Sequence, residues 1–152
     1  MPSITSLIKN LKIDFPNIKF EPSSCFLWSH NEQTVYYDSS SNNCGFLLHE
    51  LSHALLDHTV YSRDIELITM ERKAWDKSKE LALNYKVTID EDFIQSNLDT
   101  YRDWLHSRSI CPKCKASGLQ INKNIYSCLV CSNEWKVNEA RTCALRRYRL
   151  KK

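Results

Sequence analysis

The segment His49-Glu-Leu-Ser-His53 contains two histidines four residues apart, with a glutamate directly after the first. On an α-helix this spacing places both imidazoles on one face, with Cβ atoms about 5–6 Å apart, where they can bind one metal ion. The apolar residues of the stretch fall on the opposite face: Leu47, Leu51, Ala54 and Leu55. The pattern therefore predicts a helix over about 43–57 with a core face and a metal-binding face. The alternative is an ordinary amphipathic helix with solvated histidines.

Glu50 lies on the metal-binding side of this predicted helix, beside His53. A carboxylate at that place can take the proton of a metal-bound water while the water attacks a carbonyl carbon. We therefore predict a catalytic Zn²⁺ bound by His49 and His53, with Glu50 as the general base. Such a site also requires a third protein ligand and an open position for water.

The next helical pattern runs from about Asp64 to Tyr85 and offers two glutamates as the third ligand. Glu71 falls within the apolar stripe, where a carboxylate is costly unless it meets a charge or a metal. Glu66 projects onto the polar face with Lys73 and Glu80. We expect Glu71 to bind the metal. The alternative is a salt bridge between Glu71 and an Arg or Lys.

Two stretches, His49-Glu-Leu-Ser-His53-Ala-Leu-Leu-Asp-His58 and Glu71-Arg-Lys-Ala74, resemble the zinc peptidase domain of the ImmA/IrrE family over roughly residues 25–105. That family has an HExxH helix followed by a Glu-x-x-Ala helix, in a gluzincin-like arrangement. The resemblance implies metal ligands at His49, His53 and Glu71 and a general base at Glu50. It also implies a protein substrate, because members of the family cleave DNA-binding repressors.

One position departs from the family pattern. Four residues after the ligand glutamate, such enzymes often carry an Asn or Asp that bonds a ligand histidine. Here the residue is Trp75, and Asp76 points to the polar face. Asp57, four residues after His53, is the expected substitute.

A second resemblance is to SprT-like proteases, which also join an HExxH domain to a C-terminal zinc ribbon and act on proteins on DNA. Their third ligand is usually a histidine in a His-Gly context soon after the motif. In this chain His58 is followed by Thr59, so Glu71 fits better. A third possibility is a binding module for nucleic acid that has no catalytic activity.

Toward the C-terminal end the sequence contains two pairs of cysteines with metal-ligand spacing: Cys111, Cys114, Cys128 and Cys131. Two CxxC pairs at this separation predict a structural Zn²⁺ site with four thiolates, joined by a short hairpin over 119–126. Disulfides are the alternative. The sequence shows no secretory leader and no transmembrane run, so we expect a reducing cytoplasm and no membrane partner. Cys25, Cys44 and Cys143 are expected to be core or surface residues.

Charge is distributed unevenly along the chain. From His106 onward there are eleven Lys and Arg against two Asp and Glu, whereas residues 1–105 carry ten against sixteen. The segment from Arg141 to Lys152 is especially basic, so DNA or RNA is a possible partner through phosphate contacts. The alternatives are a solvated tail and a tail that contacts the acidic metallopeptidase part of the chain.

The predicted fold class is α+β. Strands near 18–20, 26–28 and 34–37 precede the HExxH helix, a short helix covers 3–11, and a last helix runs from the N-cap Asp90 to about His106. We expect a small zincin-like metallopeptidase core over residues 1–106 and a zinc ribbon with a basic tail over 107–152. The function predicted from the sequence is a cytoplasmic zinc metalloendopeptidase acting on a protein or peptide.

Overall fold

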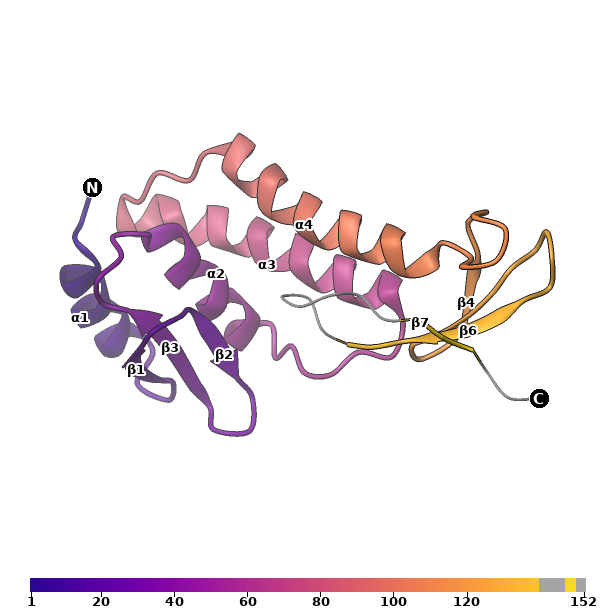
Figure 1. Cartoon of the computed structure of the whole chain (residues 1–152). Helices are drawn as coiled ribbons and strands as arrows, with labels where there is room; N and C mark the ends of the chain where they lie inside the picture. Colours follow the sequence, from indigo (N-terminus) through magenta and orange to yellow (C-terminus); the bar gives the residue numbers. More distant parts are fainter. Residues whose placement is uncertain (140–146, 150–152) are drawn as a thin grey trace. The chain divides into compact units, whose positions relative to one another are not determined.

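A computed structural model describes residues 1–139 completely and the backbone of residues 147–149 (Figure 1). The fold is α+β, as predicted, with helices and two sheets of short strands. The chain forms two compact units. The first comprises Met1–Val60 and Met70–Ile94, and the second comprises Tyr61–Thr69 and the chain from Gln95 onward. The chain passes from one unit to the other at three points: between Val60 and Tyr61, within α3 (Asp64–Tyr85) and within α4 (Glu91–Ser109). The predicted domain boundary near residue 106 stays a prediction.

A three-stranded sheet and two helices form much of the first unit. The strands β1 (Lys19–Ser23) and β3 (Thr34–Asp38) pair in parallel, and β2 (Leu27–Ser29) pairs antiparallel with β3 at the edge. The helix α1 (Ile4–Asp14) contacts β1, whereas α2 (Cys44–Leu55) contacts β2 and β3 (Figure 1). The predicted strands before α2 are therefore present, and β2 and β3 form an antiparallel pair. The first helix continues to Asp14, three residues beyond the predicted end, and Phe15 closes it by donating its N–H to the Leu11 carbonyl.

The entry of α2 is fixed by a side-chain cap. Asn43 is the N-cap, and its Oδ1 accepts a hydrogen bond from the Phe46 N–H at 3.1 Å, which satisfies one of the free donors of the first turn. The apolar face of the helix is fully buried in the core: Leu47, Leu48 and Leu51. Burial of this face sets the rotation of α2 about its axis and so decides where the two histidines point.

The second unit contains an antiparallel sheet in the order β4-β5-β6-β7. Its strands are Leu119–Asn122, Ile125–Ser127, Glu134–Val137 and Arg147–Arg149, so the predicted hairpin is present as β4 and β5. The rings of Tyr126 and Trp135 stack at 5.7 Å in its core. A Cβ on Gly118 would lie 2.4 Å from the Trp135 ring, so this glycine permits the close approach of chain and ring.

A buried arginine joins several parts of the second unit. Arg108 near the end of α4 is 1% exposed, and its guanidinium donates to the Tyr126 hydroxyl at 3.2 Å and to the Asn124 side chain at 2.6 Å. It also lies 3.7 Å from the carboxylate of Asp64, the first residue of α3, and the Tyr126 hydroxyl donates to the same carboxylate. Trp135 donates its indole N–H to the Arg108 carbonyl. These bonds compensate the charge of a cation that is otherwise costly to bury.

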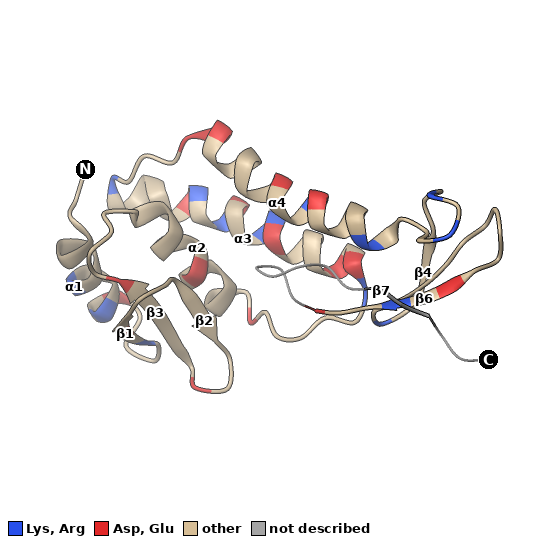
Figure 2. Ribbon diagram, viewed as in Figure 1, with Lys and Arg blue, Asp and Glu red and all other residues tan. Residues whose placement is uncertain are grey.

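Charges of both signs occur along α3 and along α4 (Figure 2). Their exposed faces are therefore mixed in charge, as is usual for solvated helices. Within the part of the chain that the structure describes, no helix combines the length and apolar character needed to cross a bilayer.

Candidate metal centres

Three predicted ligands meet inside the first unit. The helix α2 contributes His49 and His53, and α3 contributes Glu71; all three side chains are buried. The Nε2 atoms of the two histidines are 3.2 Å apart. One carboxylate oxygen of Glu71 lies 2.9 Å from Nε2 of His49, and the other lies 3.2 Å from Nε2 of His53. The three donor groups thus converge on one point from two helices.

These separations fit a metal ion. Tetrahedral Zn²⁺ with bonds of about 2.0–2.1 Å places its donor atoms about 3.3–3.4 Å apart, close to the distances seen here. Burial would raise the pKa of Glu71, but hydrogen bonds from His49 and His53 outweigh burial and lower the pKa well below its usual range. The carboxylate is therefore an anion in a buried site, and a bound cation would compensate its charge. Two imidazoles and one carboxylate are a donor set that suits zinc.

The two candidate glutamates of α3 lie in different surroundings. Glu66 is exposed, and its carboxylate accepts a hydrogen bond from the Ser62 N–H at 3.1 Å. Glu71 lies in the buried cluster with the histidines, and no Arg or Lys of the described residues forms a salt bridge with it. The helical register expected from the sequence thus places Glu71, and not Glu66, among the potential ligands.

Glu50 is next to the cluster and is held by the edge strand of the sheet. Its Oε2 accepts a hydrogen bond from the backbone N–H of Trp28 in β2 at 2.9 Å. Burial is the main reason why the pKa of Glu50 is raised above its ordinary value. The carboxylate is thus fixed in a partly buried place one residue from a potential ligand. Its role as the general base remains a prediction.

Trp75 occupies the position that departs from the family pattern. Its ring stacks on the imidazole of His49, with centroids 4.0 Å apart and planes inclined by 23°. It also contacts the rings of Phe46 and Phe93. Among the described residues, Nδ1 of His49 has no hydrogen-bond partner. On its Nδ1 side this histidine is therefore held by aromatic packing, and no carboxylate or amide of the described residues bonds it there.

The expectation that Asp57 replaces the missing polar partner is wrong. Its exposed carboxylate lies 3.5 Å from Nδ1 of His30 and not beside a ligand histidine. Instead, Nδ1 of His53 lies 2.8 Å from Nδ1 of His58. This partnership was missed because His58 follows the end of α2, where helical spacing no longer describes which side chains meet. A turn signal at the helix end would have been needed to find it.

A pair of hydroxyls lies between α2 and α3 in the same unit. Ser52 and Ser78 are fully buried, and their Oγ atoms are 3.0 Å apart. Each Oγ also lies 2.7 Å from a carbonyl oxygen one turn earlier in its own helix, that of Leu48 or Ala74. Because each hydroxyl has a single proton, at most one serine donates to the other while its partner donates to its own helix. Small side chains at this contact let the two helices approach closely. This approach brings the carboxylate of α3 to the histidines of α2.

The second potential centre is formed by Cys111, Cys114, Cys128 and Cys131. The Sγ atoms of Cys111 and Cys131 are 3.6 Å apart, and those of Cys114 and Cys128 are 3.4 Å apart. The sulfur–sulfur bond of a disulfide is about 2.05 Å long, so these cysteines are free thiols. Four thiolates bound to one Zn²⁺ would have their sulfur atoms about 3.8 Å apart. The donors and their spacing therefore fit the predicted structural zinc.

Both CxxC turns have backbone features that suit thiolate ligands. Burial would raise the pKa of Cys111, but N–H donors of Cys114 and Lys113 outweigh it and lower the pKa to about 6. Lys115 and Ser132, each following the second cysteine of a pair, adopt φ values of 66° and 62°. Their N–H groups donate to the carbonyls of Cys111 and Cys128 and so close each turn. These closed turns bring the four cysteines into one cluster of potential ligands.

Comparison with protein-family models, with curated proteins and with solved structures gives no match for this chain. The interpretation of both centres therefore rests on their geometry and donor chemistry. Cys25 is exposed and Cys44 is buried, in keeping with a surface and a core role, and Cys143 lies outside the described residues. The predicted nucleic-acid contacts fall mainly on the basic tail, where only the backbone of Arg147–Arg149 is described.

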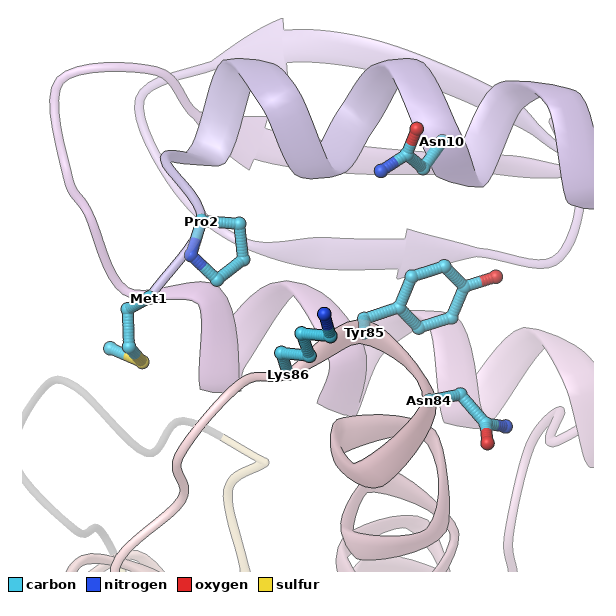
Figure 3. A pocket seen from close by; sticks show the side chains of 6 residues that line it. All are labelled: Met1, Pro2, Asn10, Asn84, Tyr85 and Lys86. Carbon is cyan, nitrogen blue, oxygen red and sulfur yellow. The ribbon is translucent and has the colours of Figure 1, made fainter.

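A hollow of about 450 Å³ elsewhere in the first unit is lined by Met1, Pro2, Asn10, Asn84, Tyr85 and Lys86 (Figure 3). The lining is polar and mostly exposed, and the Tyr85 hydroxyl already donates to Asp14 at 2.5 Å. The residues of the two potential metal centres are not part of this lining. We assign no chemistry to the hollow.

Proposed function

We propose that this chain is a zinc-dependent metallopeptidase that hydrolyses peptide bonds of a protein substrate. The observation that carries the proposal is the buried convergence of His49, His53 and Glu71, with the Glu50 carboxylate fixed beside it. A buried carboxylate beside two imidazoles is not explained by packing alone, because apolar residues of similar volume would stabilise the core as well or better. The cluster is therefore best explained by a bound metal ion.

Each residue has a distinct part in this reaction. His49, His53 and Glu71 would hold the zinc and leave one position open. When bound, zinc supplies Lewis acidity that lowers the pKa of water and polarises the scissile carbonyl. Glu50 takes the proton of the attacking water and later delivers it to the leaving amine. The Trp28 N–H holds one oxygen of Glu50, which limits the motion of this base.

The arrangement favours a gluzincin-like site over an SprT-like one. The carboxylate of Glu71 meets Nε2 of both histidines, whereas His58 meets His53 at the opposite ring nitrogen, Nδ1. A side chain at Nδ1 cannot share a metal ion with Nε2 of the same imidazole. Glu71 is therefore the third ligand in our proposal, and this choice agrees with the resemblance to the ImmA/IrrE family.

The edge strand suggests how a substrate is held. The strand β2 lies at one edge of the three-stranded sheet, and its Trp28 N–H donates to Glu50. An extended peptide that pairs with the remaining backbone groups of this edge would run past the proposed base and metal. We infer an unfolded or looped segment of a protein as the substrate. By the family resemblance, a DNA-binding regulator is the specific candidate.

The test is a comparison of new protein termini in cells that express the wild type or Glu50→Gln. The substitution should leave the zinc content at two ions per chain, because Glu50 is not a ligand, and it should remove wild-type-dependent cleavage. General-base catalysis contributes about 10²–10⁴-fold in rate. Glu66→Gln, on an exposed glutamate, is the matched control and should cleave like the wild type.

Two results would refute the proposal. Cleavage that persists undiminished in Glu50→Gln would exclude this residue as the base. A single zinc ion per wild-type chain, unaffected by His49→Ala, would show that only the cysteine centre binds metal. That result would instead support a binding module without catalytic activity.

A further inference from the structure

The end of α2 forms a hydrogen-bonded turn that directs His58 back toward the helix. Asp57 has a φ of 54°, in the left-handed region, and its N–H donates to the Ala54 carbonyl at 3.1 Å. The N–H of His58 donates to the His53 carbonyl at 3.0 Å. This pair of bonds is the Schellman motif of helix ends, in which the side chain following the left-handed residue packs on the last turn. Here the packed pair is His58 on His53, where an apolar pair is usual.

A second contact anchors the backbone of His58. Its carbonyl accepts a hydrogen bond from the indole N–H of Trp28 at 3.2 Å. The same tryptophan donates its backbone N–H to Glu50. One residue of β2 therefore holds both the proposed general base and the turn that carries His58. The position of the His58 ring is thus fixed by the turn, by Trp28 and by its contact with His53.

The contact between the imidazoles is specific to one ring nitrogen. Nδ1 of His53 and Nδ1 of His58 are 2.8 Å apart, while Nε2 of His53 faces Glu71 and His49. A metal ion on Nε2 requires the lone pair of that nitrogen, so the proton of neutral His53 lies on Nδ1. Nδ1–H then donates to Nδ1 of His58, whose own proton lies on Nε2. The hydrogen bond is satisfied only by this tautomer of each ring.

We propose that His58 is a positioning residue for the metal centre, which accepts the Nδ1–H of His53 and so fixes the tautomer and orientation of this ligand. The inference rests on the proposed function, because it assumes a metal at the cluster. Polar partners of ligand histidines typically change metal affinity by about 10–100-fold. On the side away from the metal, His53 has a hydrogen-bond acceptor in His58. His49 has no such acceptor among the described residues, because Trp75 stacks on its ring instead. The two ligand histidines are therefore oriented by different physical means.

The experiment compares His58→Phe, which keeps a ring against His53 but has no acceptor, with His58→Asn, which offers an amide oxygen. Zn²⁺ affinity is measured in the full chain by competition with a chromophoric chelator. His58→Phe should weaken zinc binding at the centre of His49, His53 and Glu71 by about 10–100-fold, and His58→Asn should recover most of the loss. The melting temperature of the metal-free chain should change little in either variant. His30→Phe, in the partly exposed hairpin, is the control and should bind zinc like the wild type.

A direct readout of the ring protons completes the test. Nitrogen-15 NMR of zinc-loaded wild type should show His53 bound through Nε2 with a proton on Nδ1. Binding through Nδ1, or His58→Phe with the affinity of the wild type, would overturn the inference. Equal losses in His58→Phe and His58→Asn would also overturn it, because the acceptor would then have no effect. A wild type with only one zinc per chain would instead refute the proposed function, so the two failures are distinguishable.

Discussion

Replacing Trp75 by alanine should destabilise the first unit more than any surface change in α3. The side chain is 1% exposed and contacts three rings, those of His49, Phe46 and Phe93, at centroid distances of 4.0, 6.0 and 5.8 Å. Truncation of a buried tryptophan costs about 3–5 kcal/mol, and the loss of three ring contacts favours the upper half of that range. For a unit of this size we expect the melting temperature to fall by at least about 16 °C.

The assay is thermal unfolding of the chain with a chelator and again with saturating zinc. Loss of the stack on His49 should also weaken the metal site. A tenfold weaker affinity adds about 1.4 kcal/mol to the cost when zinc is saturating. Leu83→Ala, on the same helix but 84% exposed, should stay within about 0.5 kcal/mol of the wild type. A cost below about 1 kcal/mol for Trp75→Ala, or an equal cost for both variants, would refute the packing argument.

Three other changes separate the parts of the molecule. Glu71→Ala should remove the zinc ion from the His-Glu centre, whereas Glu66→Ala should retain it, and atomic emission measures the zinc content per chain. The reverse result would mean that the ligand lies on the other face of α3. Cys111→Ser should remove the other zinc and unfold the sheet of the ribbon, because the metal supplies much of its folding free energy, and loss of amide dispersion in NMR reports this. Arg108→Met should cost about 3–5 kcal/mol in chemical unfolding, since it leaves the Asp64 carboxylate without its cation, and a cost near zero would contradict the role of the buried pair.

Periodicity was sufficient to predict which side chains of α2 and α3 meet. Two buried faces determine the rotation of the helices, so the spacing of His49 and His53 and the place of Glu71 within an apolar stripe followed from the sequence. The cysteine centre could be predicted equally well, because its ligands occur in pairs that are close in the sequence. In both cases the decisive contacts depend on regular local geometry.

The interactions that orient the ligands could not be derived in this way. The His53–His58 pair depends on the left-handed backbone conformation of Asp57 at the end of α2. A glycine at this position would have predicted that conformation, whereas an aspartate predicts it only weakly. The hydrogen bond from Trp28 to Glu50 joins residues 22 apart across a strand and a helix. Tertiary packing decides both contacts, and local pattern alone does not encode them.

The division of α3 between the two units has a consequence for synthesis of the protein. Asp64 in the first turn of this helix contacts Tyr126, which lies 62 residues later in the chain. At about 5–20 residues per second, a ribosome needs roughly 3–12 s to add that stretch. During this interval the start of α3 has emerged without its partners, although Glu71 can already meet the histidines of α2. Chaperones or proteases that act on nascent chains would therefore encounter the first turns of α3 before the ribbon is complete.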